Sequence, residues 1–152
     1  MAKQSAGILM YRREPSGLSV VLVHPGGPFW ATKDLGAWSI PKGEYSAGED
    51  PLSIAVREFE EETGVRLEGE FRPLGEVRQA GGKRVIAWAL EGDLDPAGIR
   101  SNSFELEWPP KSGRKQSFPE IDRAEWFAPD AAREKINPSQ RELIDRLVRL
   151  VG

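Results

Sequence analysis

The sequence has no cysteine and only one histidine, His24. Without cysteine the chain can form no disulfide, no thiolate metal site and no cysteine nucleophile. A single histidine cannot build the zinc sites that need several histidine ligands. No G-x-S-x-G stretch supports a serine nucleophile that would act with His24. These absences exclude thiol chemistry and histidine-rich zinc sites, and they leave a serine–histidine–acid triad without support.

The sequence also lacks a long apolar run and an excess of positive charge. No stretch is apolar for long enough to cross a bilayer, and the N-terminal residues lack the apolar core of a secretory signal. Net charge is −3, so no overall field favours nucleic acid. We therefore expect a cytoplasmic protein with no membrane and no stable nucleic-acid partner. A polyanionic ligand would have to be met by local positive charge or by a metal ion.

The length of 152 residues suits a single domain, 1–152, with one sizeable core. β-rich runs punctuated by glycine and proline alternate with helical patterns, which predicts a mixed sheet with helices in the α+β or α/β/α range. The expected strands are 5–11, 18–23, 38–40, 71–79, 84–90 and 124–127, with 104–108 as a possible further strand. We expect a short helix at 129–135 and a final helix from 137 whose apolar face is Leu143, Ile144, Leu147 and Leu150.

A further helix is expected to begin at Pro51 and end at Gly64. Asp50 is a good N-cap residue, proline is favoured at the first helical position, and glycine commonly ends helices. Apolar residues recur at i, i+3, i+4 and i+7 and form one stripe. The stripe consists of Leu52, Ala55, Val56 and Phe59.

Six glutamates lie between Pro41 and Gly64. Three of them, Glu58, Glu61 and Glu62, are spaced i, i+3 and i+4, so they share a helix face that points away from the apolar stripe. Clustered carboxylates cost free energy unless positive charge lies between them. Arg57, four residues before Glu61, offsets only part of the charge, and a hard divalent cation would supply the rest. The alternative is a glutamate-rich face that is simply solvated.

The spacing around these acids is specific. Gly43 is followed after five residues by Glu49, and after seven more by the run R-E-F-E-E-E-T-G-V, which ends at Val65. This stretch, Gly43–Val65, resembles the signature of Nudix hydrolases at every position. The resemblance implies the Nudix fold, an α/β/α sandwich with a central mixed β-sheet, over nearly the whole chain.

The resemblance also implies roles for the acids. Glu58, Glu61 and Glu62 would be metal ligands together with the backbone carbonyl of Gly43, and the ion would be Mg²⁺ or Mn²⁺ held against a pyrophosphate. Arg57 and Glu49 would orient these ligands, and one glutamate would act as general base.

Family members often take a further acid from outside the signature. Here Glu120 is the candidate, both as metal ligand and as part of a catalytic set with Arg57, Glu58 and Glu61. The alternative for Glu120 is an ordinary acid of a surface loop.

Candidate substrate contacts lie on either side of the signature. Lys42 could meet a phosphate, and Phe29 and Trp30, in a Gly/Pro-punctuated loop, could stack on a base or pack against the sheet. A basic run, Lys111, Arg114 and Lys115, could close over a polyphosphate or be solvated.

The expected function is a Mg²⁺- or Mn²⁺-dependent hydrolase that cleaves a pyrophosphate bond in a nucleoside diphosphate derivative. Dinucleoside polyphosphates or nucleoside triphosphates are favoured, because the Pro-Lys-Gly sequence at Pro41–Gly43 resembles that of the dinucleoside polyphosphate and inositol pyrophosphate branch. The tyrosine that often follows the signature in dinucleoside polyphosphate hydrolases is absent, so the branch is left open. The alternative is a Nudix-fold module that senses a nucleotide without cleaving it. Oligomeric state is left open.

Overall fold

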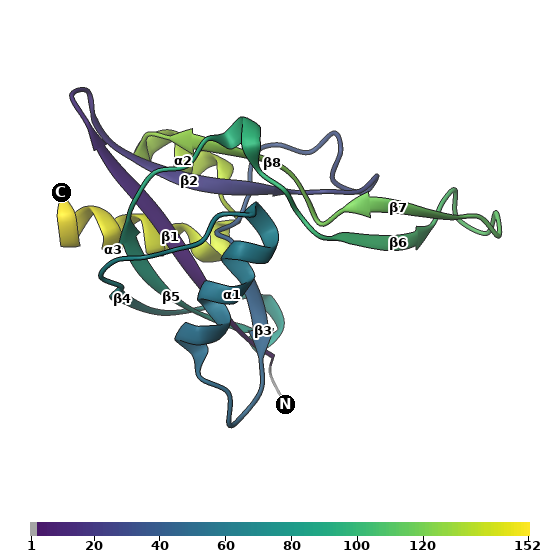
Figure 1. The fold of residues 1–152 in the computed structure, drawn as a ribbon, viewed down its shortest axis with the longest axis horizontal. Coiled ribbons are helices and arrows are strands. Elements are labelled where there is room, and N and C mark those ends of the chain that lie inside the picture. The colour runs from purple at the N-terminus through teal and green to yellow at the C-terminus, as the bar shows by residue number, and fades with distance from the viewer. Residues whose placement is uncertain (1–2) are drawn as a thin grey trace.

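The computed structural model describes residues 3–152 and contains two sheets (Figure 1). In the six-stranded sheet the order is β4-β5-β1-β2-β8, with β3 paired to β1, and β6 and β7 form a separate two-stranded sheet. The strands are β1 (Gln4–Glu14), β2 (Gly17–Pro25), β3 (Lys42–Tyr45), β4 (Arg72–Arg78), β5 (Arg84–Glu91), β6 (Ser103–Glu107), β7 (Lys115–Pro119) and β8 (Ile121–Phe127). The helices are α1 (Pro51–Thr63), α2 (Pro129–Lys135) and α3 (Arg141–Val151), with short 3₁₀ turns at Ala80–Gly82, Pro96–Gly98 and Pro138–Gln140.

Strand β1 is the centre of the large sheet. It pairs in parallel with β5 and antiparallel with β2 and β3, so the sheet is mixed as predicted. Alternate side chains of β1 enter different cores. Ile8 and Met10 pack with the residues of α1, and Leu9 and Tyr11 pack with those of α2 and α3. The predicted α/β/α layering is therefore confirmed.

Helix α1 has the predicted boundaries. The Asp50 carboxylate accepts a hydrogen bond from the Ser53 amide at 3.3 Å, and Gly64 ends the helix with φ = 77°. Ala55 and Phe59 are fully buried, and the other two residues of the predicted stripe are partly buried against the same cluster. The buried stripe fixes the rotation of the helix. The prediction that the glutamates point away from this stripe is wrong: Glu58 and Glu62 are partly buried, and Glu62 lies beside the stripe against the start of β3.

Two predicted features of the chain are wrong in position. The segment 38–40 is not a strand but forms isolated bridges to Val23 and Ile136. The strand in this region is β3, which begins directly after Pro41. Proline lacks only the backbone N–H donor, and the carbonyl of Pro41 still accepts a hydrogen bond from the Ile8 amide. On α3, Leu150 is 36% exposed and Val151 is buried in its place. Leu143, Ile144 and Leu147 are buried as predicted.

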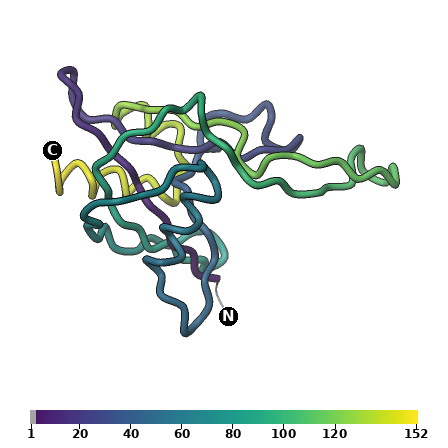
Figure 2. Tube along the Cα trace, viewed as in Figure 1, coloured from purple at the N-terminus to yellow at the C-terminus, as the bar shows by residue number. Residues whose placement is uncertain are grey.

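The β6–β7 sheet projects from the body of the molecule (Figures 1 and 2), and residues 103–119 are called the arm below. The sequence predicted β6 as a possible strand but not its partner β7. No residue of the arm is fully buried. No helix within residues 3–152 is long and apolar enough to span a membrane.

Candidate active site

Glu62, in the last turn of α1, is held against the start of β3. The backbone amide of Lys42 donates a hydrogen bond to Glu62 Oε2 at 3.1 Å. Burial, followed by the charge of Glu58, raises the pKa of Glu62 to about 8. Without a cation this carboxyl group therefore holds a proton near pH 7.

Glu58 lies one turn earlier and its side chain rests on Gly43. A Cβ atom at position 43 would lie 2.2 Å from Cγ and Cδ of Glu58, so only glycine allows this approach. Burial, then the charge of Glu61, raises the pKa of Glu58. The glycine of the signature thus lets the Glu58 side chain approach the backbone of β3.

Arg57 supplies the positive charge nearest to Glu58 and Glu61. Its Nη2 lies 3.6 Å from Glu58 Oε1, and its Nε lies 3.7 Å from Glu61 Oε1. The Arg57 side chain is 55% exposed, so solvent screens these contacts. The arginine offsets part of the acidic charge, as expected from its i, i+4 spacing.

Glu120 is brought to the same region from a distant part of the sequence. Its amide donates to the carbonyl of Asn102 at 2.8 Å, and its carbonyl accepts from the amide of Gly26 at 2.8 Å. The negative charge of Glu120 contributes to the raised pKa of both Glu58 and Glu62. Glu120 is thus close enough for its charge to act on both carboxyl groups.

Of the remaining predicted residues, Lys42 lies beside the acids, next to Glu62. Burial lowers the pKa of the Lys42 ammonium, against the opposing effect of Glu62. Phe29 and Trp30 are 62% and 40% exposed, and the Lys33 ammonium lies 5.0 Å from the Trp30 ring. These aromatics are therefore available to a ligand. Glu49, by contrast, accepts a hydrogen bond from the Ser46 amide at 2.8 Å and closes a turn.

The donor set fits a hard divalent cation. Every candidate donor is an oxygen, and Glu58 and Glu62 are carboxyl groups whose burial is not balanced by a full positive charge. No three acidic or histidine side chains within residues 3–152 converge into a cage for an ion. Mg²⁺ needs no such cage, because it usually takes one or two protein carboxylates together with waters and substrate phosphates.

Sequence reasoning missed the backbone contacts that assemble this site. The Asn102 amide donates to the Glu61 carbonyl at 3.3 Å, and the Gly26 amide donates to the Glu120 carbonyl. A Cβ atom on Gly26 would lie 1.9 Å from the Pro119 carbonyl oxygen. The only sequence signal of this contact was the glycine pair of the G-G-P sequence at 26–28, since glycine lets two backbone segments approach closely.

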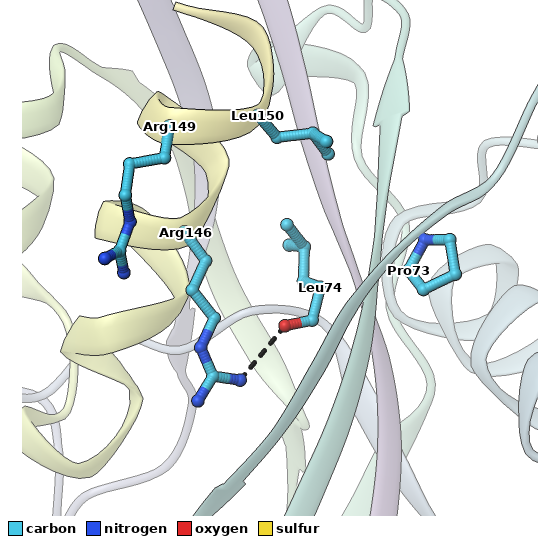
Figure 3. A pocket seen from close by; sticks show the side chains of 5 residues that line it. All are labelled: Pro73, Leu74, Arg146, Arg149 and Leu150. Atoms are coloured by element: carbon cyan, nitrogen blue, oxygen red, sulfur yellow. Dashed lines mark hydrogen bonds between the residues drawn. The ribbon is translucent and has the colours of Figure 1, made fainter.

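A separate hollow of about 350 Å³ lies between β4 and α3, lined by Pro73, Leu74, Arg146, Arg149 and Leu150 (Figure 3). There Arg146 donates to the Leu74 carbonyl at 3.0 Å. None of the predicted site residues lines this hollow.

The chain is thus an α/β/α sandwich with a cluster of carboxylates on α1, beside Gly43 of β3. The family model described as NUDIX domain matches residues 1–147, and the chain belongs to the Nudix family. The family predicted from the sequence is thereby confirmed.

Similar proteins include two curated enzymes. Bis(5'-nucleosyl)-tetraphosphatase [asymmetrical] of Rattus norvegicus is 31% identical over 103 residues, which cover 60% of this chain and 66% of the rat protein. RNA pyrophosphohydrolase of Rhodospirillum rubrum is 40% identical over 65 residues, covering 41% of this chain and 38% of the relative. The chain therefore spans less than two thirds of the length of either enzyme.

Solved structures confirm the fold. A C. elegans Ap4A hydrolase binary complex superposes with a TM-score of 0.66 at 19% identity, covering 97% of each chain. The NUDIX domain of Shewanella oneidensis NrtR complexed with ADP ribose superposes with a TM-score of 0.68 at 15% identity, covering 100% of this chain and 90% of that one.

Proposed function

We propose that this protein is a Mg²⁺- or Mn²⁺-dependent pyrophosphohydrolase that cleaves a phosphoanhydride bond in a nucleoside diphosphate derivative. The observation that carries the proposal is that Glu58 packs on Gly43 and Glu62 accepts a hydrogen bond from the Lys42 amide, where burial, more than any neighbouring charge, raises the pKa of both carboxyl groups. Glu58, Glu62 and the carbonyl of Gly43 would hold the ion, with Glu61 and Glu120 beside them. When bound, the ion would polarise the phosphoryl oxygens and neutralise developing charge.

The chain's own residues then divide the remaining work. Glu58 and Glu62 would hold the cation as carboxylates, and Glu62, whose pKa is raised to about 8 without it, would release its proton when the cation binds. The Lys42 ammonium meets a phosphate oxygen of the substrate. Glu61, with Glu120 as the other candidate, accepts a proton from the attacking water as a new P–O bond forms and the bridging P–O bond breaks. Arg57 holds Glu61 in place through the contact at 3.7 Å.

The favoured substrates are dinucleoside polyphosphates and nucleoside triphosphates. The names of the rat and Rhodospirillum rubrum relatives support a nucleotide with a phosphoanhydride chain. The exposed rings of Phe29 and Trp30 are suited to stack on a base. Absence of cysteine supports action in the reducing cytoplasm.

The test is chromatographic separation of the nucleotide products from a panel of nucleoside triphosphates, dinucleoside polyphosphates, nucleotide sugars and ADP-ribose, with Mg²⁺ or with EDTA. Wild type is compared with Glu61→Gln and with Glu60→Gln, which makes the same change on the adjacent, exposed residue. We expect turnover only with metal, a loss of about 100-fold or more in kcat for Glu61→Gln, and less than twofold for Glu60→Gln. Metal-dependent tight binding without turnover of any panel member would contradict the proposal and favour a nucleotide sensor.

A further inference from the structure

His24 is the only histidine of the chain, its side chain is fully buried, and it has no part in the proposed hydrolysis. It lies near the end of β2, opposite Arg123 of β8, where the register of the two strands shifts. The pairing continues with Pro25 opposite Ile121, which leaves Asp122 as an extra residue on β8. Such a bulge re-aims a side chain, and here the Asp122 carboxylate lies against the His24 ring.

The two ring nitrogens of His24 contact different parts of the molecule. Nε2 lies 2.7 Å from the carbonyl oxygen of Lys33, and Nδ1 lies 2.8 Å from Asp122 Oδ1. A carbonyl oxygen only accepts, so Nε2–H is the donor to Lys33. Asp122 belongs to a strand of the large sheet, whereas Lys33 is an exposed residue of the β2–β3 loop, residues 26–41. The ring therefore ties this loop to the sheet.

Lys33 in turn holds Trp30, one of the two exposed aromatics that are proposed to stack on a base. The Lys33 amide donates to the Trp30 carbonyl at 2.9 Å. The Lys33 ammonium lies 5.0 Å from the Trp30 ring, a distance at which a cation attracts the face of an aromatic ring. Trp30 is thus held at its backbone and at its ring by the residue that His24 anchors.

The other contacts of the β2–β3 loop act elsewhere along it. Phe29 rests edge-on against Trp108 of the arm, with ring centroids 5.6 Å apart, and Asp34 accepts from the Trp38 indole N–H at 2.8 Å. Within residues 3–152, the bond from His24 is the only hydrogen bond that a side chain makes to the backbone of residues 26–33. Its loss would leave the turn around Trp30 without an anchor to the sheet.

From these contacts we infer that His24 is a positioning residue, which holds Trp30 where the base of the substrate stacks on it. The inference rests on the proposed function, because that function makes Trp30 a contact of the base. His24 acts through Lys33 and touches no substrate atom. Removing its hydrogen bond therefore weakens ligands that carry a base and spares ligands that consist of phosphates alone.

Three substitutions separate this role from packing. His24→Phe keeps a ring to pack edge-on against Trp38, where the ring centroids are 5.1 Å apart, but it has no donor for Lys33. His24→Gln restores an amide N–H at the position of Nε2. Arg123→Gln is the matched control, because it removes the cation 3.8 Å from Asp122 and leaves both bonds of His24. Thermal melting checks that all three variants fold.

Binding is measured by calorimetry with Mg²⁺ and two probes that resist cleavage. One is an ATP analogue with methylene groups at both bridging positions, and the other is the same methylene-bridged triphosphate without a nucleoside. His24→Phe should bind the ATP analogue about fivefold or more weakly through lost stacking and the bare triphosphate less than twofold more weakly. His24→Gln should recover most of the affinity for the ATP analogue, and Arg123→Gln should change neither affinity more than twofold.

A double-mutant cycle tests whether His24 acts through Trp30. Trp30→Ser alone should weaken the ATP analogue by about fivefold or more, and adding His24→Phe to it should weaken binding no further. The inference would be overturned if His24→Phe weakened both probes equally. It would also be overturned if the effect of His24→Phe were just as large in the Trp30→Ser background.

Turnover separates this inference from the proposed function. For a nucleotide substrate, His24→Phe should raise KM about fivefold or more and change kcat less than twofold. If wild type cleaves nucleotides and His24→Phe changes neither KM nor the affinity for the ATP analogue, the positioning role is refuted and the hydrolase stands. If wild type cleaves nothing but His24→Phe still weakens only the probe with a base, the hydrolase is refuted and the positioning role stands.

Discussion

Replacing Glu62 by glutamine removes a carboxyl group whose pKa is raised from an ordinary 4.5 to about 8, first by burial and then by Glu58. Because the pKa in the folded protein lies above that in the unfolded chain, ionisation is penalised only in the folded state. The contribution to stability is full below about pH 4.5 and is lost as the pH rises towards 8. With about 1.4 kcal/mol for each tenfold change in proton affinity, wild type loses roughly 2–3 kcal/mol from this group between pH 6 and pH 9.

The assay is urea unfolding at pH 6 and pH 9 in EDTA, for wild type, Glu62→Gln and the exposed control Glu60→Gln. Glutamine does not ionise, so its stability lacks this pH dependence. From pH 6 to pH 9 the free energy of unfolding of Glu62→Gln, relative to that of wild type, should therefore rise by roughly 2–3 kcal/mol. Mg²⁺ at pH 9 should stabilise wild type and Glu60→Gln but not Glu62→Gln. The reasoning would be refuted if the difference in free energy of unfolding between wild type and Glu62→Gln were the same at both pH values. Equal stabilisation of all three proteins by Mg²⁺ would also refute it.

Three further substitutions test the scaffold of the site. Gly43→Ala places a Cβ atom 2.2 Å from the Glu58 side chain, so Mn²⁺ affinity measured by calorimetry should fall about 10–100-fold. An unchanged affinity would show that metal binding does not need the close approach of Glu58 to position 43. Asp50→Ala removes the cap on the Ser53 amide and should lower the free energy of unfolding by about 1 kcal/mol; an unchanged urea midpoint would count against the cap. Phe59→Ala empties a fully buried position and should cost about 3–5 kcal/mol in the same assay, whereas a loss below 1 kcal/mol would mean that the core refills around it.

The elements that the sequence predicted well are those with local signals. Helix α1 is marked by Asp50 and Pro51 at its start and by Gly64 at its end, and each acts through residues at most a few positions away. The glutamates of the signature follow from the same helix, because its spacing alone determines which of them share a face. Glu58, Glu61 and Glu62 could therefore be grouped from their positions in the sequence.

The elements that were missed depend on distant partners. Strand β3 is short, and it exists because it pairs with β1, about forty residues earlier. Strand β7 is largely polar, K-Q-S-F-P, and is a strand only because β6 lies beside it. On α3 the sequence predicted Leu150 as buried and the structure buries Val151 instead, since both lie about one turn after Leu147 and only packing in the fold selects one.

The same distinction holds for the site. Glu120 could be proposed only from the family resemblance, because its approach to Glu58 and Glu62 depends on the hydrogen bonds of Asn102 and Gly26. The pairing of β6 with β7 into the arm also escaped prediction.

The central claim is that the acids of α1 hold a divalent cation together with a diphosphate. The most direct measurement is a crystal structure grown with Mn²⁺ and a nucleoside triphosphate analogue that has a methylene bridge in place of the scissile oxygen, with anomalous scattering to locate the metal. The account predicts an anomalous peak bound by Glu58, Glu62 and the Gly43 carbonyl and shared with the analogue's phosphates. A bound analogue with no peak at these groups, and with both carboxylates turned to solvent, would contradict it.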